Sequence, residues 1–157
     1  MAPIKPQDIA RGQAAEARFQ AWLEASRFPY FYIDQTMATF ARHLRGDLKR
    51  PDFFVGIRGV GLLGFDVKAK TVYRGQIFFD VEEVRRLANF GQLFNVSIYF
   101  ACLQPRGGGA WWAWVPDLAL RSPAPATPGV FAVPVRELQL VSFREPFDVA
   151  LSEALRR

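Results

Sequence analysis

The sequence predicts an α/β domain in which a central mixed β-sheet is flanked by helices. Residues 50–70 contain two short runs rich in Phe, Val, Ile and Leu, separated by a glycine-bearing turn, and this pattern predicts an antiparallel β-hairpin. Amphipathic helical patterns precede and follow the hairpin. Residues 96–103 are apolar on both faces of a strand, which is typical of a strand buried inside a mixed or parallel sheet with helices on both sides.

The length and composition predict one compact globular domain. A chain of 157 residues can bury a single core and is too short for two. Half of the residues are hydrophobic, which excludes a disordered chain. Lys and Arg exceed Asp and Glu by 20 to 15, and the net charge of +5 weakly favours a polyanionic partner.

The cysteine content and the hydropathy pattern bear on the compartment. Cys102 is the only cysteine, which excludes an intrachain disulfide and a cysteine-based zinc cluster and agrees with a reducing compartment. The first residues lack the apolar centre of a secretory signal, and no run approaches the roughly 20 apolar residues of a membrane span. We therefore expect a cytoplasmic protein with no membrane contact.

The first helix is expected from an N-cap at Asp8 to about Arg27, in an alanine-rich stretch that favours helix. Its expected apolar stripe follows spacings of three and four residues and comprises Gly12, Ala15, Phe19, Trp22, Leu23 and Ser26. Glu16 lies at the edge of this stripe, so it is either a solvated side chain or one that points along the margin of the core. Pro29 ends the helix, and residues 30–34 form a short strand.

Residues 35–49 form a basic segment that could contact a phosphate backbone or could be a solvated connection. Its basic side chains are Arg42, His43, Arg45 and Lys49. His43 is the only histidine in the chain, so no site that requires two histidines can form. A Ser-His-Asp triad would depend on this one ring, and we do not favour it.

The hairpin carries charged residues within apolar runs, where charged side chains are unexpected unless they have a specific role. Side chains alternate between the two faces of a strand, so Asp66, Lys68 and Lys70 share one face. Asp52 lies near the start of the preceding strand and could approach Asp66 across the pair. Two carboxylates and an ammonium at one point can hold a divalent metal and position a water for phosphodiester cleavage. The alternative is a pair of surface aspartates, one of them paired with Lys68.

The remaining elements complete the layers around the sheet. Residues 72–79 are extended, and Asp80 and Glu83 have the spacing of a capping box before a helix that ends near Phe94. The buried stripe of this helix is expected to be Val84, Leu87, Ala88, Gly91 and Phe94. Further strands are expected at residues 110–115, 130–135 and 138–143. A terminal helix with Pro146 in its first turn should bury Phe147, Ala150, Leu151, Ala154 and Leu155.

The order helix, short strand, hairpin, helix and buried strand, with charges on the hairpin, resembles the PD-(D/E)xK nuclease superfamily. This group includes type II restriction enzymes and archaeal Holliday-junction resolvases. Pro51-Asp52 and Asp66-Val67-Lys68 match its motif, and 13 residues separate the two aspartates. Each half of the motif is short and common, but both halves fall in strand-like runs, in the correct order, between amphipathic helices.

The resemblance also extends to the first helix, where these enzymes frequently carry a further glutamate, and Glu16 occupies that place. It covers roughly Ile9 to Leu103 and implies a restriction-endonuclease-like αβββαβ core over about residues 8–103. Residues of about 110–157 would then be a C-terminal extension of strands and a helix within the same single domain.

The resemblance implies a metal-dependent deoxyribonuclease. Asp52, Asp66, the Val67 carbonyl and Glu16 would bind one or two Mg²⁺ ions, with Mn²⁺ as a substitute. Lys68, together with the metal, would activate the attacking water and offset charge on the phosphate. The candidate phosphate contacts are Lys70, Arg42, Arg45, Lys49 and Arg50. The implied partner is DNA, and a homodimer is expected because cutting two strands often needs two active sites.

Two other function classes remain open at this point. A nuclease-like fold could bind DNA or a protein without turnover. A small protein-interaction domain could carry these charges incidentally. Binding without cleavage would favour the first of these classes, and failure to bind nucleic acid at low salt would favour the second.

Overall fold

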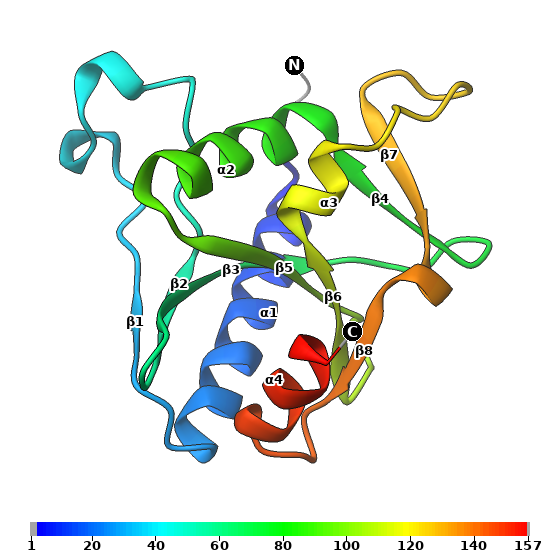
Figure 1. The fold of residues 1–157 in the computed structure, drawn as a ribbon. Coiled ribbons are helices and arrows are strands. Elements are labelled where there is room, and N and C mark those ends of the chain that lie inside the picture. Colours follow the sequence, from blue (N-terminus) through cyan, green and yellow to red (C-terminus); the bar gives the residue numbers. More distant parts are fainter. Residues whose placement is uncertain (1–2, 157) are drawn as a thin grey trace.

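The computed structural model describes residues 3–156 (Figure 1). A six-stranded mixed sheet lies at its centre, with the strand order β1-β2-β3-β5-β6-β8. These strands are β1 (Tyr30–Tyr32), β2 (Phe53–Ile57), β3 (Gly61–Ala69), β5 (Ser97–Leu103), β6 (Gly109–Trp114) and β8 (Gln139–Ser142). The α/β class predicted from the sequence, a central mixed sheet flanked by helices, is confirmed.

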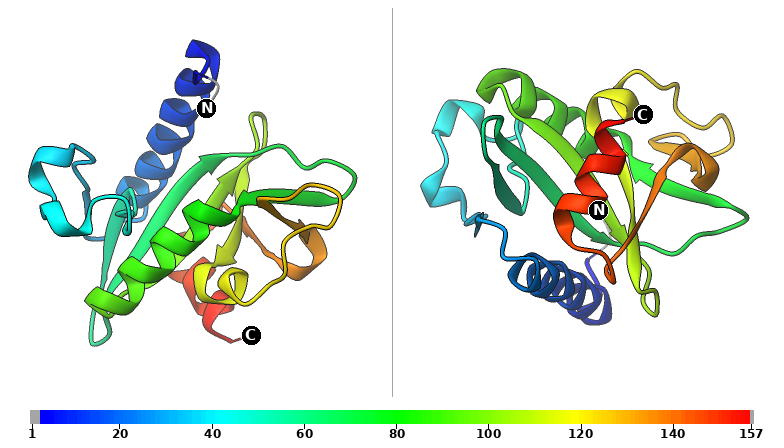
Figure 2. Two further views of the ribbon diagram at one scale, coloured as in Figure 1. Left: turned by 90° about the horizontal axis from the view of Figure 1, so that it is seen from above. Right: turned by 60° about the horizontal axis from the view of Figure 1, so that its bottom comes forward.

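Helices cover both faces of this sheet. They are α1 (Pro6–Ala25), α2 (Val81–Phe94), α3 (Val115–Ala119) and α4 (Phe147–Leu155). The view from above in Figure 2 shows α1 and α2 on opposite sides of the sheet. One hydrophobic core joins α1 and α4 to the first face through Phe19, Phe65 and Phe147. A second core joins α2 and α3 to the other face through Leu87, Phe100 and Leu118.

The predicted hairpin is formed by β2 and β3, which pair antiparallel with Phe53 opposite Phe65. Its turn contains Gly59, whose φ of 77° lies in the left-handed region that glycine adopts without strain. Phe65 and Val67 point into the core beneath α1. By alternation, Asp66 and the other even-numbered side chains of β3 point toward the face covered by α2.

The predicted buried strand is β5, which lies parallel to β3 in the middle of the sheet. A parallel pair needs a long crossover connection, and here α2 is part of it. Ala101 faces the first core while Phe100 and Cys102 face the second, which explains why this strand is apolar on both sides. The αβββαβ order is thus α1, β1, β2, β3, α2 and β5.

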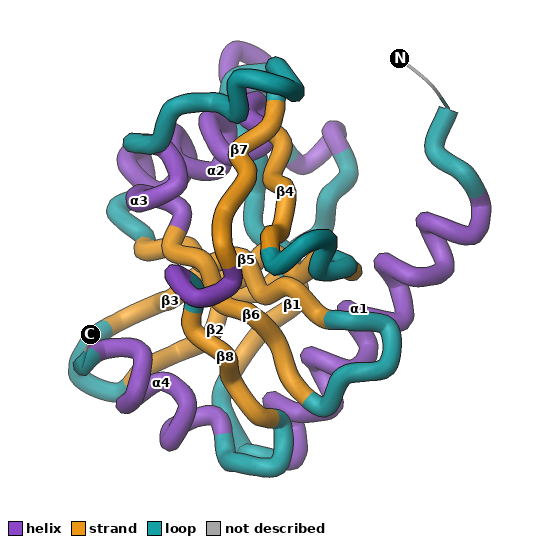
Figure 3. The backbone as a smooth tube through the Cα atoms, turned by 90° about the vertical axis from the view of Figure 1, so that its right-hand side faces the viewer, coloured by secondary structure: helices purple, strands orange, loops and turns teal. Residues whose placement is uncertain are grey.

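The extended segment expected at residues 72–79 contributes a strand that does not join the central sheet. It forms β4 (Gln76–Asp80), which pairs antiparallel with β7 (Val130–Pro134) in a separate two-stranded sheet. Figure 3 shows these two strands running together beside α2 and α3. The segment that leads into α2 is therefore held by a strand from the C-terminal part of the chain.

The expected N-cap of the first helix is wrong. The helix begins at Pro6 and Lys5 precedes it, so Asp8 lies inside the first turn. Proline is well suited to the first helical position because its missing N–H would have no partner there. Asp8 still suits the helix start, where a negative charge interacts favourably with the helix dipole.

Two side chains expected in the core are exposed instead. Phe94 is 51% exposed, and Phe90 is the buried aromatic residue of this part of α2. The ring centroids of Phe90 and Phe54 lie 6.1 Å apart, and those of Phe94 and Phe90 lie 4.6 Å apart. Leu155, the last residue of α4, is 61% exposed. Within residues 3–156, no helix has the length and apolar character needed to cross a membrane.

Candidate active site

Two aspartates are the buried polar side chains of the described chain, with exposures of 7% for Asp52 and 0% for Asp66. Asp52 directly precedes β2, and Asp66 lies within β3. The Val67 N–H donates a buried hydrogen bond of 2.8 Å to Asp52 Oδ2. The first half of the motif is thereby fixed to the second half by a side-chain to main-chain contact.

Gly64 explains how the chain delivers Asp52 to this place. A Cβ atom at Gly64 would lie 3.0 Å from Pro51 Cγ and 3.1 Å from Ile98 Cγ1. The absent side chain therefore leaves room for the Pro51 ring to pack directly on β3. Because Pro51 is rigid and directly precedes Asp52, this packing sets the backbone position of Asp52.

Asp66 is contacted by two ammonium groups. Lys68 Nζ lies 3.3 Å from Asp66 Oδ2. Lys49 Nζ lies 3.0 Å from Oδ1, but its hydrogen bond goes to Oδ2 at 3.1 Å. Asp66 Oδ1 is thus a buried carboxylate oxygen that accepts no hydrogen bond from the described residues. Its electrostatic partner is the Lys49 ammonium at 3.0 Å.

Glu83 is a residue of this cluster that the sequence reasoning missed. Its Oε2 atom accepts hydrogen bonds from Lys68 at 2.9 Å and from Lys49 at 3.0 Å. Lys49, Asp66, Lys68 and Glu83 therefore alternate in sign around a closed arrangement, which we call the charge ring.

The capping-box spacing was the available signal for Glu83. Its main-chain N–H donates to Asp80 Oδ1 at 2.8 Å, as the capping pattern predicts. In the full motif the glutamate side chain would also return to the cap residue. Here that carboxylate instead accepts from Lys49 and Lys68, so Glu83 joins the start of α2 to the floor of the site.

The electrostatic environment shifts the pKa values of Asp52 and Glu83 in opposite directions. Burial, followed by the negative charge of Asp66, raises the pKa of Asp52 to about 8. Burial also acts on Glu83, but the charges of Lys68 and Lys49 outweigh it and lower the Glu83 pKa to about 2. For Lys68, burial favours the neutral amine, yet Asp66 and Glu83 overcome this and raise its pKa. Lys68 is therefore a permanently charged ammonium at neutral pH.

Glu16 comes from α1, on the opposite face of the sheet, and reaches the edge of the site. The Tyr32 hydroxyl donates to its Oε2 at 2.9 Å. Burial and this contact raise the pKa of Tyr32 to about 12. The Glu16 charge contributes to the raised pKa of Asp52, which shows that the two carboxylates are in electrostatic range. Among residues 3–156, however, no three His, Cys, Asp or Glu side chains converge into a group able to hold a metal.

The structure distributes the candidate phosphate contacts among different environments. Lys49 lies in the charge ring. Lys70 donates to the Phe78 carbonyl at 2.7 Å and thereby ties the end of β3 to β4. Arg45 and Arg50 donate to carbonyls of the basic segment itself, at Met37 and Thr36 respectively. Arg42 is exposed on a short 3-10 turn.

The residues present fit a divalent cation. Asp66 offers a buried oxygen with no hydrogen bond, and Asp52 places a second carboxylate beside it. Burial, followed by the negative charge of Asp66, disfavours the ionised form of Asp52 and raises its pKa, and a bound cation would offset both effects. Oxygen donors of this kind suit Mg²⁺, which binds through one or two carboxylates and keeps several waters.

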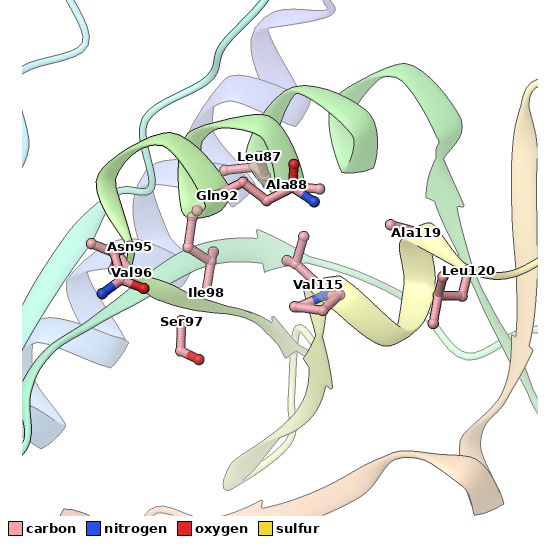
Figure 4. Close-up of a pocket in the computed structure, with 12 residues that line it drawn as sticks. Leu87, Ala88, Gln92, Asn95, Val96, Ser97, Ile98, Val115, Ala119 and Leu120 are labelled. Carbon is pink, nitrogen blue, oxygen red and sulfur yellow. The ribbon is translucent and has the colours of Figure 1, made fainter.

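A groove of about 400 Å³ lies between α2, β5 and α3, and none of its lining residues belongs to the charge ring (Figure 4). Its walls include Leu87, Ile98, Val115 and Leu120. Among residues 3–156, no Asp, Glu, His, Lys or Arg side chain lines it, so these residues offer no acid or base for catalysis there. The chemistry of the described chain is concentrated at Asp52 and the charge ring.

Comparison with known proteins establishes the fold. No protein-family model matches the sequence, and no curated protein matches it. The structure is similar to that of Hjc, a Holliday junction resolvase from the archaeal hyperthermophile Archaeoglobus fulgidus, with a TM-score of 0.60 and 19% sequence identity. The similarity covers 88% of this chain and 99% of the resolvase. The chain therefore has the fold of a Holliday junction resolvase, as its PD-(D/E)xK motif predicts.

Proposed function

We propose that this protein is a metal-dependent endonuclease that hydrolyses phosphodiester bonds of DNA. The observation that carries the proposal is the hydrogen bond from the Val67 amide to Asp52, which brings both halves of the motif to one point beside Lys68. The resolvase-like fold, which is matched over 88% of this chain, supports the same conclusion.

The metal would be held by Asp52 and Asp66, with the Val67 carbonyl as a further oxygen donor. Glu16 would contribute at the edge of this group, from the side where Tyr32 holds it. Mg²⁺ is the proposed ion and Mn²⁺ a substitute. When bound, such an ion lowers the pKa of the attacking water and offsets negative charge on the phosphate.

Lys68 has a role that follows from its protonation state. Burial favours its neutral amine, but Asp66 and Glu83 raise its pKa and so favour the protonated ammonium. It donates hydrogen bonds and presents positive charge where charge develops on the scissile phosphate. Asp66 and Glu83 orient its ammonium, which reduces the reorganisation needed during the reaction.

The proposed substrate is DNA because the Archaeoglobus protein is a Holliday junction resolvase, and because the basic segment at residues 35–49 leads directly into the site. A homodimer belongs to the same proposal, since cutting two strands often needs two active sites. We also propose that the protein acts in the cytoplasm, where it would meet its DNA substrate.

The test uses Asp66→Ala and Lys68→Ala in purified protein. Linear, supercoiled, branched and single-stranded DNA are incubated with Mg²⁺ or Mn²⁺, with EDTA as the blank. Each variant should lose cleavage by on the order of 10²–10³-fold because each removes a group that stabilises the transition state. Arg58→Ala, at the exposed hairpin turn, is the matched control and should cleave like the native protein. Unchanged cleavage by either site variant, with its fold intact, would overturn the site assignment.

One observation favours a second function, a DNA-binding or protein-binding module without turnover. The charge ring is balanced by its own residues, because Lys49 and Lys68 offset Asp66 and Glu83. Such a site could be stable without any added cation. DNA binding at low salt, with no cleavage of any of the four DNA forms in either metal, would favour this function over the nuclease.

A further inference from the structure

Lys49 lies in the site although it is outside both halves of the motif. Its main-chain N–H donates to the Arg86 carbonyl at 3.2 Å, and the Arg86 guanidinium donates to the Leu48 carbonyl at 3.2 Å. These contacts hold the backbone around Lys49 against α2. Leu48 is also buried in the second core, so packing fixes the backbone at Lys49 while its side chain stays free to rotate.

The Lys49 ammonium donates to Asp66 Oδ2 at 3.1 Å and also lies beside Oδ1, which accepts no hydrogen bond from residues 3–156. The distance from Nζ to Oδ1 is 3.0 Å. A divalent cation bound to this oxygen would face a like charge at close range, and the repulsion is strong because Asp66 is fully buried. Lys49 and a metal ion therefore cannot both hold this oxygen at these distances.

Glu83 provides Lys49 with another anionic partner. Its Oε2 lies 3.0 Å from Lys49 Nζ, the same distance as Asp66 Oδ1. A small rotation of the flexible lysine chain can therefore release Asp66 while keeping the contact with Glu83. Lys68 is already closer to Glu83, at 2.9 Å, than to Asp66, at 3.3 Å.

We propose that Lys49 is an internal competitor for the metal position on Asp66, and that Glu83 accepts its ammonium when a divalent cation binds. This inference rests on the proposed function, because it concerns the same metal site. It assigns to Lys49 a role as a positioning residue of Asp66 in the metal-free protein. It assigns to Glu83 the role of lowering the free energy needed to move the Lys49 ammonium away from Asp66 when the metal binds, without direct contact to the metal.

The first experiment measures Mn²⁺ affinity without DNA, from the electron paramagnetic resonance signal of free Mn²⁺. Lys49→Met removes the competing charge and should tighten Mn²⁺ binding by roughly tenfold, within the usual range of coupling between sites. Lys49→Arg keeps the charge and should bind Mn²⁺ like the native protein. Lys5→Met removes the same charge at an exposed position before α1 and should leave the affinity unchanged.

A double-mutant cycle tests whether Glu83 acts through Lys49. Glu83→Gln should weaken Mn²⁺ binding because Lys49 loses its alternative partner. Lys49→Met combined with Glu83→Gln should restore much of this loss, since no ammonium then needs to move from Oδ1. A direct Glu83 contact with the metal would instead give the full loss in both backgrounds, which would overturn the role assigned to Glu83.

The outcomes separate this inference from the proposed function. Equal or weaker Mn²⁺ binding by Lys49→Met overturns the inference, even if the native protein cleaves DNA. Tighter binding by Lys49→Met supports it, even if no DNA substrate is cleaved and the nuclease proposal fails. Absence of Mn²⁺ binding in every variant would overturn both. Circular dichroism of each variant confirms folding, and Lys49→Gln replaces Lys49→Met if the apolar side chain prevents it.

Discussion

The Asp52 carboxylate accepts a hydrogen bond from the Val67 amide at 2.8 Å, in a part of β3 that is buried. This contact places a carboxyl side chain where a neighbouring strand would otherwise supply a carbonyl, because β2 begins only at Phe53. Asp52 therefore has a structural role in addition to its proposed metal contact. The two roles can be separated by substitution.

Asp52→Ala should destabilise the fold by about 1–3 kcal/mol because the buried Val67 N–H loses its acceptor. Asp52→Asn retains an oxygen that can accept this bond and should be more stable than Asp52→Ala. Both variants should lose metal-dependent cleavage. Denaturant unfolding at pH 6 gives the stabilities, and equal stability of the two variants would show that the hydrogen bond contributes nothing.

The raised pKa of Asp52 predicts a pH-dependent stability in the presence of EDTA. Burial and the Asp66 charge raise this pKa to about 8, so the folded protein holds a proton that the unfolded chain has already lost. For a carboxyl group shifted in this direction, stability falls as the pH rises from its usual pKa, near 4, through the folded value. We expect a loss of about 1–2 kcal/mol between pH 6 and pH 8.

Thermal unfolding of the native protein and of Asp52→Asn, across pH 6–9, isolates this group from all others. The native protein should lose stability relative to the variant as the pH rises. Adding Mg²⁺ at pH 8 should restore the lost stability in the native protein but not change Asp52→Asn, because a bound cation offsets the second negative charge. Parallel curves for both proteins would contradict the assignment to Asp52.

Gly64 should not tolerate a side chain. Gly64→Ala places a Cβ 3.0 Å from the rigid Pro51 ring, so the ring and the adjacent Asp52 must shift. Overpacking of this kind costs about 1–3 kcal/mol, and cleavage should slow as well. Gly56→Ala is the matched control in β2, because its Cβ would meet Pro29 Cγ at an ordinary 3.4 Å. Equal unfolding free energies for the two variants would contradict this account.

Two arginines, one within the basic segment and one directly after it, should behave differently on substitution. Arg42 is exposed, so Arg42→Ala should weaken DNA binding and reduce the slope of log affinity against log salt by about one, with unchanged stability. The Arg50 guanidinium donates to Thr39 Oγ1 and the Thr36 carbonyl, each at 2.8 Å, so Arg50→Ala should also lower the thermal stability. Fluorescence anisotropy over a KCl series in EDTA measures the slope. An unchanged slope for Arg42→Ala would remove this residue from the DNA surface.

Features that depend on local geometry are predictable from this sequence. Alternation along a strand is enough to place Asp66 and Lys68 on one face of β3, and the capping pattern is enough to start α2 after Asp80. The apolar character of residues 96–103 likewise predicts a central strand. Each of these inferences uses only neighbours within a few positions along the chain.

Features that depend on long-range packing are not predictable in the same way. Glu83 reaches the charge ring because Val84 and Leu87 dock α2 on the sheet in one particular rotation. Lys49 points to Asp66 because its backbone is bonded to Arg86, and the irregular segment 35–49 has no period from which this direction follows. The pairing of β4 with β7 joins segments about 50 residues apart in the chain, and the sequence of neither strand indicates which strand it pairs with.

The pairing of β4 with β7 also determines how the protein can be shortened. Removing everything after β5 would leave β4 without its partner, strip β6 and β8 from the sheet, and expose the core that Phe147 fills. Because β4 leads directly into α2, this loss would reach Glu83 at the start of that helix. The part of the chain that carries the motif and the C-terminal third should therefore unfold together in one cooperative transition, and residues 3–103 should not fold in isolation.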